Sequence, residues 1–315
     1  MSLPQDEEVL AENRIMRLVV LAVVCLALMA VLYVIAVHTS QGQRIDDAAV
    51  DGRTLRPSVL QATDRVLNTI SVASLALGGL AVMLVALVRE RLYLALAAGV
   101  VIVGANVTTQ ILKTGILDRP DLVGPTDPIG VMNSFPSGHS TVAMSLAVAL
   151  VLVVPTAARV LAAGWGIVYA TLVGAGTVTA GWHRPSDVVA AYLIVMAWAG
   201  ISVAVLISRE GAVPDPGSRS RLAARAPSAS PFLVGTGVGA LVGALAGVAV
   251  TLVATRQSDL DAVRLSAAYA ASIVTIAACA LVLMVVLMWI LRGVALDQPT
   301  DVSRAAPRGT AQPAR

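Results

Sequence analysis

The sequence predicts an all-α membrane protein, in which a six-helix core precedes a two-helix C-terminal extension to give eight membrane spans. Hydrophobic residues make up 57% of the 315 residues and charged residues only 13%, whereas soluble domains carry about 25% charged residues. Several apolar stretches approach the ~20 residues that cross ~30 Å of hydrocarbon as a helix. The expected helices cover residues 16–38, 66–88, 92–112, 139–154, 161–181, 187–207, 232–254 and 267–291.

The segments between and around these helices define the expected organisation. The first apolar run is too long for a signal peptide and lacks a cleavage site, so we expect a retained anchor. The loop 39–65 is mixed in polarity and compatible with a short interfacial helix. Residues 208–231 are rich in Arg, Ser, Ala and Pro, which is typical of a linker, and the polar tail is typical of disorder. The predicted units are therefore a core (1–207), a cytoplasmic linker (208–231), a two-helix extension (232–291) and a disordered cytoplasmic tail (292–315).

The distribution of positive charge predicts how the chain is oriented in the membrane. Arginines are concentrated on flanks that share a side with the N-terminus, among them Arg14, Arg17, Arg89 and Arg91. The positive-inside rule then places both termini in the cytoplasm of a plasma (inner) membrane. The net charge of +3 is small and spread over these flanks, which argues against a nucleic-acid partner.

The seventh expected helix carries glycines along one face. They recur every fourth residue, at Gly235, Gly239, Gly243 and Gly247. Such a face lets another helix approach closely. It is explained either by packing against the eighth helix or the core, or by homodimerisation.

One polar motif directly precedes the fourth helix, in the sequence Pro136-Ser137-Gly138-His139. The N-terminus of a helix offers free N–H donors and partial positive charge, which favour a phosphate. His139 is then placed to protonate a leaving oxygen. A simple helix cap, with Ser137 as the capping residue, is the alternative.

A second motif begins the sixth helix, where His183 and Asp187 are four residues apart and so share a helix face. Asp187 is expected to fix the tautomer of His183 and leave its other nitrogen free to attack phosphorus. The alternative is that Asp187 only complements the helix dipole.

A third motif ends the third helix and supplies cations, Lys113 and Arg119, which stabilise a phosphoryl group in transfer. Their separation of six residues puts them about 120° apart on a regular helix. The helix is therefore expected to end near Gly115. Interfacial snorkelling is the alternative reading of these cations.

Together the three motifs resemble the signature of the type 2 phosphatidic acid phosphatase superfamily, over about residues 60–207. The resemblance implies that His183 forms a phosphohistidine, that Asp187 orients it, and that His139 is the general acid. It implies no metal and no cofactor. The phosphate oxygens would be held by Lys113, Arg119, Ser137 and the backbone of Gly138.

The chain departs from the family pattern in two places. Five residues instead of six separate Lys113 from Arg119, and the family's Ser-Arg pair falls on Gly176-Thr177. The clamping arginine is thus absent, and Arg184 or Thr177 is expected to replace it. A catalytically weak or inactive lipid-phosphate-binding scaffold stays open as an alternative, as does a lipid transporter.

The expected substrate is a membrane lipid phosphate. The bias to Ala, Val and Arg over Lys is typical of a high-GC bacterium. This favours a polyprenyl pyrophosphate of cell-envelope synthesis, followed by phosphatidic acid and phosphatidylglycerol phosphate. The motifs themselves do not separate these lipids, and we expect the active site on the extracytoplasmic face.

Overall fold

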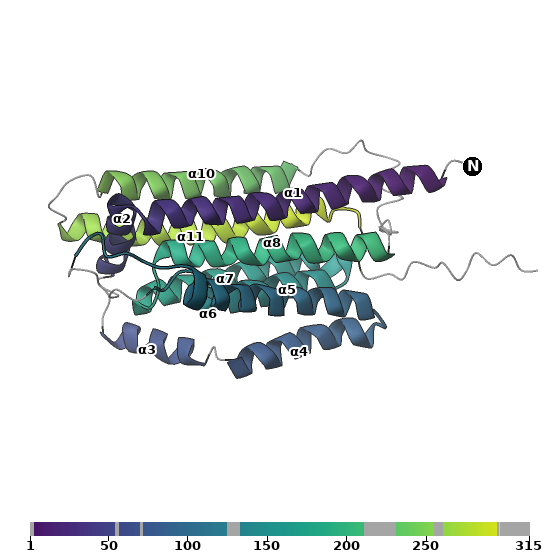
Figure 1. Cartoon of the computed structure of the whole chain (residues 1–315), viewed down its shortest axis with the longest axis horizontal. Coiled ribbons are helices and arrows are strands. Elements are labelled where there is room, and N and C mark those ends of the chain that lie inside the picture. The colour runs from purple at the N-terminus through teal and green to yellow at the C-terminus, as the bar shows by residue number, and fades with distance from the viewer. Residues whose placement is uncertain are drawn as a thin grey trace, which may run out of the picture.

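The computed structural model describes residues 3–53, 57–69, 72–124, 133–210, 231–254, 261–294 and 296, and the regular elements in these ranges are helices. Most of the helices run lengthwise side by side as a bundle (Figure 1). The all-α class predicted from the sequence is confirmed. The elements are α1 (Leu3–Val37), α2 (Ser40–Asp51), α3 (Pro57–Asn68), α4 (Val72–Val88), α5 (Leu92–Ile111) with a π-helical turn (Leu112–Ile116), α6 (Gly138–Val153), a 3-10 turn (Thr156–Ala158), α7 (Arg159–Ala180), α8 (Pro185–Glu210), α10 (Pro231–Ala254) and α11 (Ala262–Ile290).

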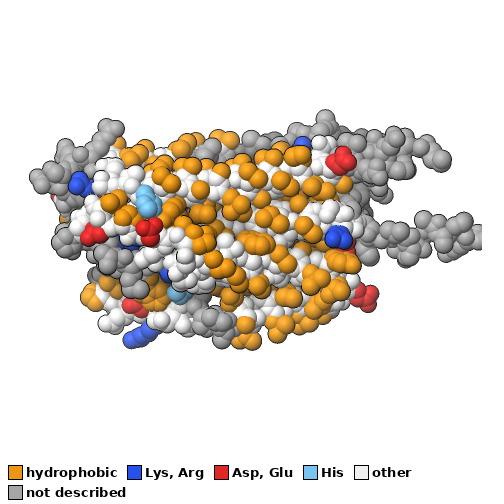
Figure 2. Space-filling model, in the orientation of Figure 1, with side chains coloured by type: hydrophobic (Ala, Val, Ile, Leu, Met, Phe, Trp, Pro, Cys, Tyr) orange, Lys and Arg blue, Asp and Glu red, His pale blue; other side chains and the backbone are white. Residues whose placement is uncertain are grey.

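The flank of the bundle is suited to a membrane. In the described residues, five helices are long and apolar enough to span it, and α6 and part of α4 are shorter apolar helices. Hydrophobic side chains cover the middle of the flank in Figure 2, whereas charged side chains gather towards its two ends. Large apolar residues of the helices, such as Leu77, Leu172 and Val205, are exposed. These features are those of an integral membrane protein.

The segment between the first two expected spans differs from prediction. Residues 39–65 hold most of two helices, α2 and α3, and the expected helix 66–88 is divided between α3 and α4. α2 begins where the Thr39 side chain accepts a hydrogen bond from Gly42 N, a regular N-cap. It buries polar residues, Gln43, Asp46 and Asp47. A search for apolar spans passes over such a helix because it is short and rich in polar residues.

The core is centred on α8, which packs against α1, α5, α6 and α11. Ile194, Val195 and Met196 are fully buried there. At Gly200 an added Cβ would lie 2.6 Å from a backbone oxygen of α1, so only glycine permits this close contact between α1 and α8.

The last helix belongs to the same core. Ile276 and Met284 of α11 are fully buried within it, and Arg159 of α7 donates a hydrogen bond to Val294 O at 2.6 Å. The expected two-helix extension is therefore continuous with the six-helix unit through α11. The proposed linker beyond Glu210 and most of the predicted tail lie outside the described residues.

The glycine face of α10 packs partly on α11. A Cβ at Gly247 would lie 2.3 Å from Thr275 Oγ1, and one at Gly243 would be in ordinary contact with α11. Nothing lies within 4 Å of a Cβ at Gly239, and the surroundings of Gly235 are outside the described side chains. Packing against the eighth expected helix therefore accounts for Gly247, and homodimerisation through the face stays a prediction.

Candidate active site

The three polar motifs meet at one end of the bundle. The chain's N-terminus lies at the opposite end, and α2 lies at the end that the motifs share (Figure 1). The contributing elements are the π-helical turn after α5, the loop that follows it, the start of α6, and the turn from α7 to α8. Segments more than 70 residues apart along the chain are thus brought together.

The turn between α7 and α8 fixes His183. α7 ends at Gly181, whose φ of 75° is in the left-handed region that favours glycine. Thr177 O then accepts the backbone N–H groups of Trp182 at 2.9 Å and His183 at 3.3 Å. The turn is closed by these bonds, and Pro185 begins α8 directly after it.

Asp187 lies next to Nδ1 of the His183 imidazole and holds the ring in place. Its Oδ2 lies 3.3 Å from His183 Nδ1 and also accepts from Ser134 Oγ at 2.6 Å and Arg184 N at 2.9 Å. Asp187 is fully buried and His183 is 4% exposed. A carboxylate with three donors on one oxygen is rigid, so it sets the Nδ1–H tautomer and leaves Nε2 as the free nitrogen.

His139 faces His183 from the start of α6. The centroids of the two rings are 6.2 Å apart, and the His139 ring also packs at 5.2 Å against that of Trp182. Ser137 N donates to Asp187 O at 3.0 Å, which ties the start of α6 to α8. The two imidazoles are thus close enough to act on the same phosphoryl group.

Ser137 and Gly138 have different surroundings. The Ser137 side chain is the N-cap of α6: its Oγ accepts from Ser140 N at 3.3 Å and donates to Ser140 Oγ at 3.0 Å. It is fully buried, so the structure gives its hydroxyl a capping role. Gly138 is open enough that an added Cβ would meet only Gln110, at 3.4 Å.

Lys113 and Arg119 lie in and just after the π-helical turn that follows α5. Lys113 is in the π-helical turn, which ends at Ile116, and Leu117 is extended. The expected helix end near Gly115 is therefore present, and Arg119 follows in the loop. Arg119 is 8% exposed, and neither of its terminal nitrogens has a hydrogen-bond partner among the described residues. Buried guanidinium donors without an acceptor are suited to an anionic ligand.

The two residues expected to replace the family arginine are engaged elsewhere. Arg184 is fully buried and its Nε donates to Asp47 Oδ1 at 2.7 Å, while Nη1 reaches Ser134 Oγ at 3.3 Å. Thr177 is also fully buried, and its hydroxyl donates to Gly174 O at 2.8 Å. Both side chains thus support the turn instead of opening towards a ligand.

The sequence reasoning missed the two acidic residues of α2. Asp47 pairs with Arg184, and Asp46 accepts from Ser186 N at 3.2 Å and from the Ser186 hydroxyl. Burial, and then the nearby charge of Asp187, raise the pKa of Asp46 to about 7. The adjacent acidic pair after a capping threonine was the available signal, but its docking onto α8 is a tertiary feature.

Within the described residues, no group of three or more His, Cys, Asp and Glu side chains is arranged to hold a metal ion. The metal-free chemistry that the motifs imply stays a prediction.

The fold and this site define an integral membrane protein with two facing histidines at one end of its bundle. Residues 94–209 match the model of the PAP2 superfamily. The match runs from α5 to α8 and contains all three motifs. This segment therefore matches the type 2 phosphatidic acid phosphatase superfamily, and the match supports a phosphatase acting on phosphate esters. Searches of curated proteins and of solved structures found no match.

Proposed function

We propose that this protein hydrolyses the phosphomonoester or pyrophosphate of a membrane lipid through a phosphohistidine at His183. The observation that carries the proposal is the pair of facing imidazoles, 6.2 Å apart between centroids, with Asp187 on Nδ1 of one of them. The guanidinium of Arg119, whose terminal nitrogens have no partner among the described residues, adds an anion-binding group at the same end of the bundle.

The mechanism follows from this arrangement. His183 Nε2 attacks phosphorus, and the bond from phosphorus to the leaving oxygen breaks while His139 gives that oxygen a proton. A water molecule then attacks the phosphohistidine and gives a proton to His139. The P–N bond breaks, which releases inorganic phosphate and restores His183. Lys113, Arg119 and the N-terminus of α6 neutralise charge on the phosphoryl oxygens.

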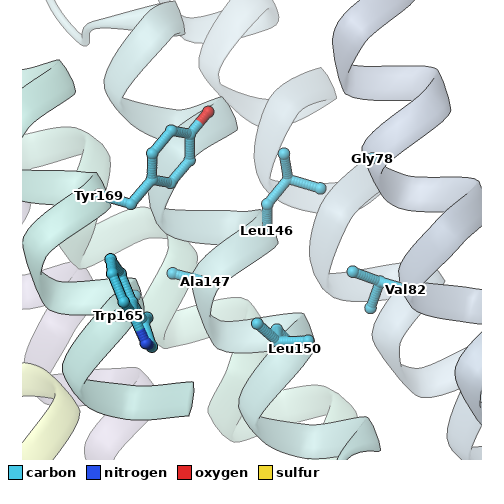
Figure 3. Close-up of a pocket in the computed structure, with 8 residues that line it drawn as sticks. Gly78, Val82, Leu146, Ala147, Leu150, Trp165 and Tyr169 are labelled. Atoms are coloured by element: carbon cyan, nitrogen blue, oxygen red, sulfur yellow. The ribbon is translucent and has the colours of Figure 1, made fainter. Parts of the chain in front are cut away.

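An apolar hollow beside α6 supports an amphiphilic substrate. It has a volume of about 240 Å³ and lies between α4, α6 and α7. In Figure 3 the side chains of Val82, Leu146, Leu150 and Trp165 surround it. Residue 147, which also lines the hollow, is eight residues from His139 along α6, or about 12 Å at the helical rise. A lipid whose phosphate binds at the start of α6 can therefore lay its chain along this helix.

Among lipids, we favour a polyprenyl pyrophosphate, with phosphatidic acid and phosphatidylglycerol phosphate next, and a site on the extracytoplasmic face of a bacterial inner membrane. The arginine-rich flanks and the composition of the chain support this choice.

The direct test is phosphate release by the purified protein in detergent with a chelator present. Undecaprenyl pyrophosphate, phosphatidic acid and phosphatidylglycerol phosphate are offered in parallel. We expect turnover that is lost in His183→Ala and retained in His38→Ala, a matched control because His38 lies at the same end but pairs with Asp118 at 3.7 Å. Turnover that survives His183→Ala would refute the covalent mechanism.

A second function is supported by the engagement of Thr177 and Arg184. If no side chain replaces the family arginine in binding the phosphoryl oxygens of the transition state, the protein is a lipid-phosphate-binding scaffold without catalysis. Folded protein that binds the lipids but releases no phosphate from any of them would establish this function.

A further inference from the structure

An arginine from outside the three motifs lies against the turn that carries His183. Arg53 directly follows Gly52, the C-cap of α2. Its guanidinium occupies the space beside Gly181: a Cβ added there would lie 1.5 Å from Arg53 Nη1, 2.4 Å from Cζ and 2.7 Å from Nη2. Any other residue at position 181 would displace this guanidinium, and the positive φ of Gly181 independently favours glycine there.

The guanidinium of Arg53 has an unsatisfied donor. Nη1 is buried and has no hydrogen-bond partner among the described residues. Burying a charged N–H group without an acceptor costs free energy, and the cost is removed when an anion accepts the bond. Arg53 therefore shares with Arg119 the property expected of a group that binds an anionic ligand.

Arg53 lies near the position at which the arginine of the family pattern is missing from this chain. Gly181 precedes His183 by two residues, so their Cα atoms are within about 7 Å of one another. Residue 177, where the family arginine is absent, lies one turn before Gly181 on the same face of α7. A side chain that packs on Gly181 thus lies along the same face from which an arginine at 177 would extend.

The end of α2 is held firmly against the rest of the bundle. Arg53 N donates to Val50 O at 3.4 Å, and Gly52 N donates to Ala48 O at 3.0 Å. A Cβ at Gly52 would lie 1.8 Å from Leu265 O, so the chain at this point is pressed against α11. The Asp47–Arg184 ion pair fixes the middle of α2 to the start of α8. The backbone that carries Arg53 is therefore held in a fixed position.

We propose that Arg53 binds a non-bridging oxygen of the phosphoryl group on its way to and from His183. It would supply from the α2 end the positive charge that the family takes from the residue at position 177. This inference rests on the proposed function, because it assigns a further substrate-binding residue to the same site.

The kinetic test compares Arg53→Ala and Arg53→Lys with Arg65→Ala, a control in which an exposed arginine of neighbouring α3 is removed. For Arg53→Ala we expect kcat/KM to fall on the order of a hundredfold or more, the scale of losing one transition-state donor. Lysine should restore part of it, because it keeps the charge without the planar fork. Added ethylguanidinium should rescue Arg53→Ala but not His183→Ala. A loss that guanidinium does not rescue, or kcat/KM within about threefold of wild type, would overturn the proposal.

A binding test separates this inference from the proposed function. Orthovanadate and inorganic phosphate are titrated into wild type, Arg53→Ala and Arg65→Ala in detergent, with melting curves to show that each is folded. We expect Arg53→Ala to bind both anions at least about tenfold more weakly, as for loss of a charge-assisted hydrogen bond, and Arg65→Ala to bind as wild type does. If no lipid is hydrolysed but this difference is found, the proposed function fails and the assignment of Arg53 as an anion ligand stands. Equal binding by the three proteins, or none by wild type, would overturn the assignment.

Discussion

The buried carboxyl of Asp46 makes the stability of the fold depend on pH. It accepts hydrogen bonds from Ser186, and Arg119 and Arg184 attract its charged form, but burial and the charge of Asp187 outweigh them and raise its pKa to about 7. In the unfolded chain an aspartate titrates near 3.9. Between these values the folded protein binds more protons than the unfolded one, so the free energy of unfolding falls as pH rises. The contribution is fully present below about pH 4 and is lost as pH rises through 7.

The size of the effect follows from the shift. The pKa moves from 3.8 to about 7, which is roughly 3 units and, at 1.36 kcal/mol each, on the order of 4 kcal/mol as an upper bound. A kcal/mol shifts the melting temperature by roughly 2–4 °C in a protein of a few hundred residues. Asp46→Asn keeps a carbonyl acceptor for Ser186 N and has no charge at any pH. The variant should therefore lose a pH dependence of the melting temperature that is at most roughly 8–16 °C.

The measurement is the melting temperature of wild type and Asp46→Asn in detergent, followed by tryptophan fluorescence at pH 5 and pH 8. Asp121→Asn is the control, because Asp121 is an exposed carboxyl in the loop just after Arg119. We expect the wild type and the control to lose more stability between the two pH values than Asp46→Asn does. An equal decrease in all three proteins would refute the assignment of a protonated, buried Asp46.

Three further predictions concern the site and its support. Asp187→Asn replaces the carboxylate that fixes the nucleophile's tautomer with a neutral amide, which can also favour the wrong tautomer. Phosphate release should fall on the order of a hundredfold or more with little change in KM, and an unchanged kcat would show that the carboxylate is not needed. Asp47→Asn leaves Arg184 buried without its ion pair and should lower the free energy of unfolding by roughly 3–5 kcal/mol, measured as a lower melting temperature. Gly200→Ala places a methyl group 2.6 Å from the backbone of α1 and should cost roughly 1–3 kcal/mol. The same change at Gly164, which has nothing within 4 Å of an added Cβ, should be nearly neutral, and equal melting temperatures would contradict the packing described.

The sequence was sufficient to predict where the motifs meet. His139, His183 and Lys113 each lie at the end of an apolar run, and runs of similar length that alternate in direction bring every second end to the same side. The four-residue spacing of His183 and Asp187 similarly predicted their proximity, because helical periodicity is a local property.

The contribution of α2 could not be predicted in the same way. Asp46, Asp47 and Arg53 lie in a polar segment that has no span-like hydropathy, and their partners are more than a hundred residues away along the chain. The packing of α11 into the core was missed for a related reason. A helix that is apolar on every side gives no periodic pattern to show which face is buried by protein and which by lipid.

The ion pair between Asp47 and Arg184 also bears on how this protein can be recombined with its relatives. The portion that matches the family begins at residue 94, whereas the carboxylates that hold the turn beside the nucleophile come from residues 46 and 47. The matched segment therefore does not contain all the residues that hold this turn in place. A chimera that transplants residues 94–209 alone would receive a buried arginine whose counter-ion stayed behind. Exchanges between relatives should succeed only when residues 40–53 travel with residues 94–209, and the two segments should accordingly change together during evolution.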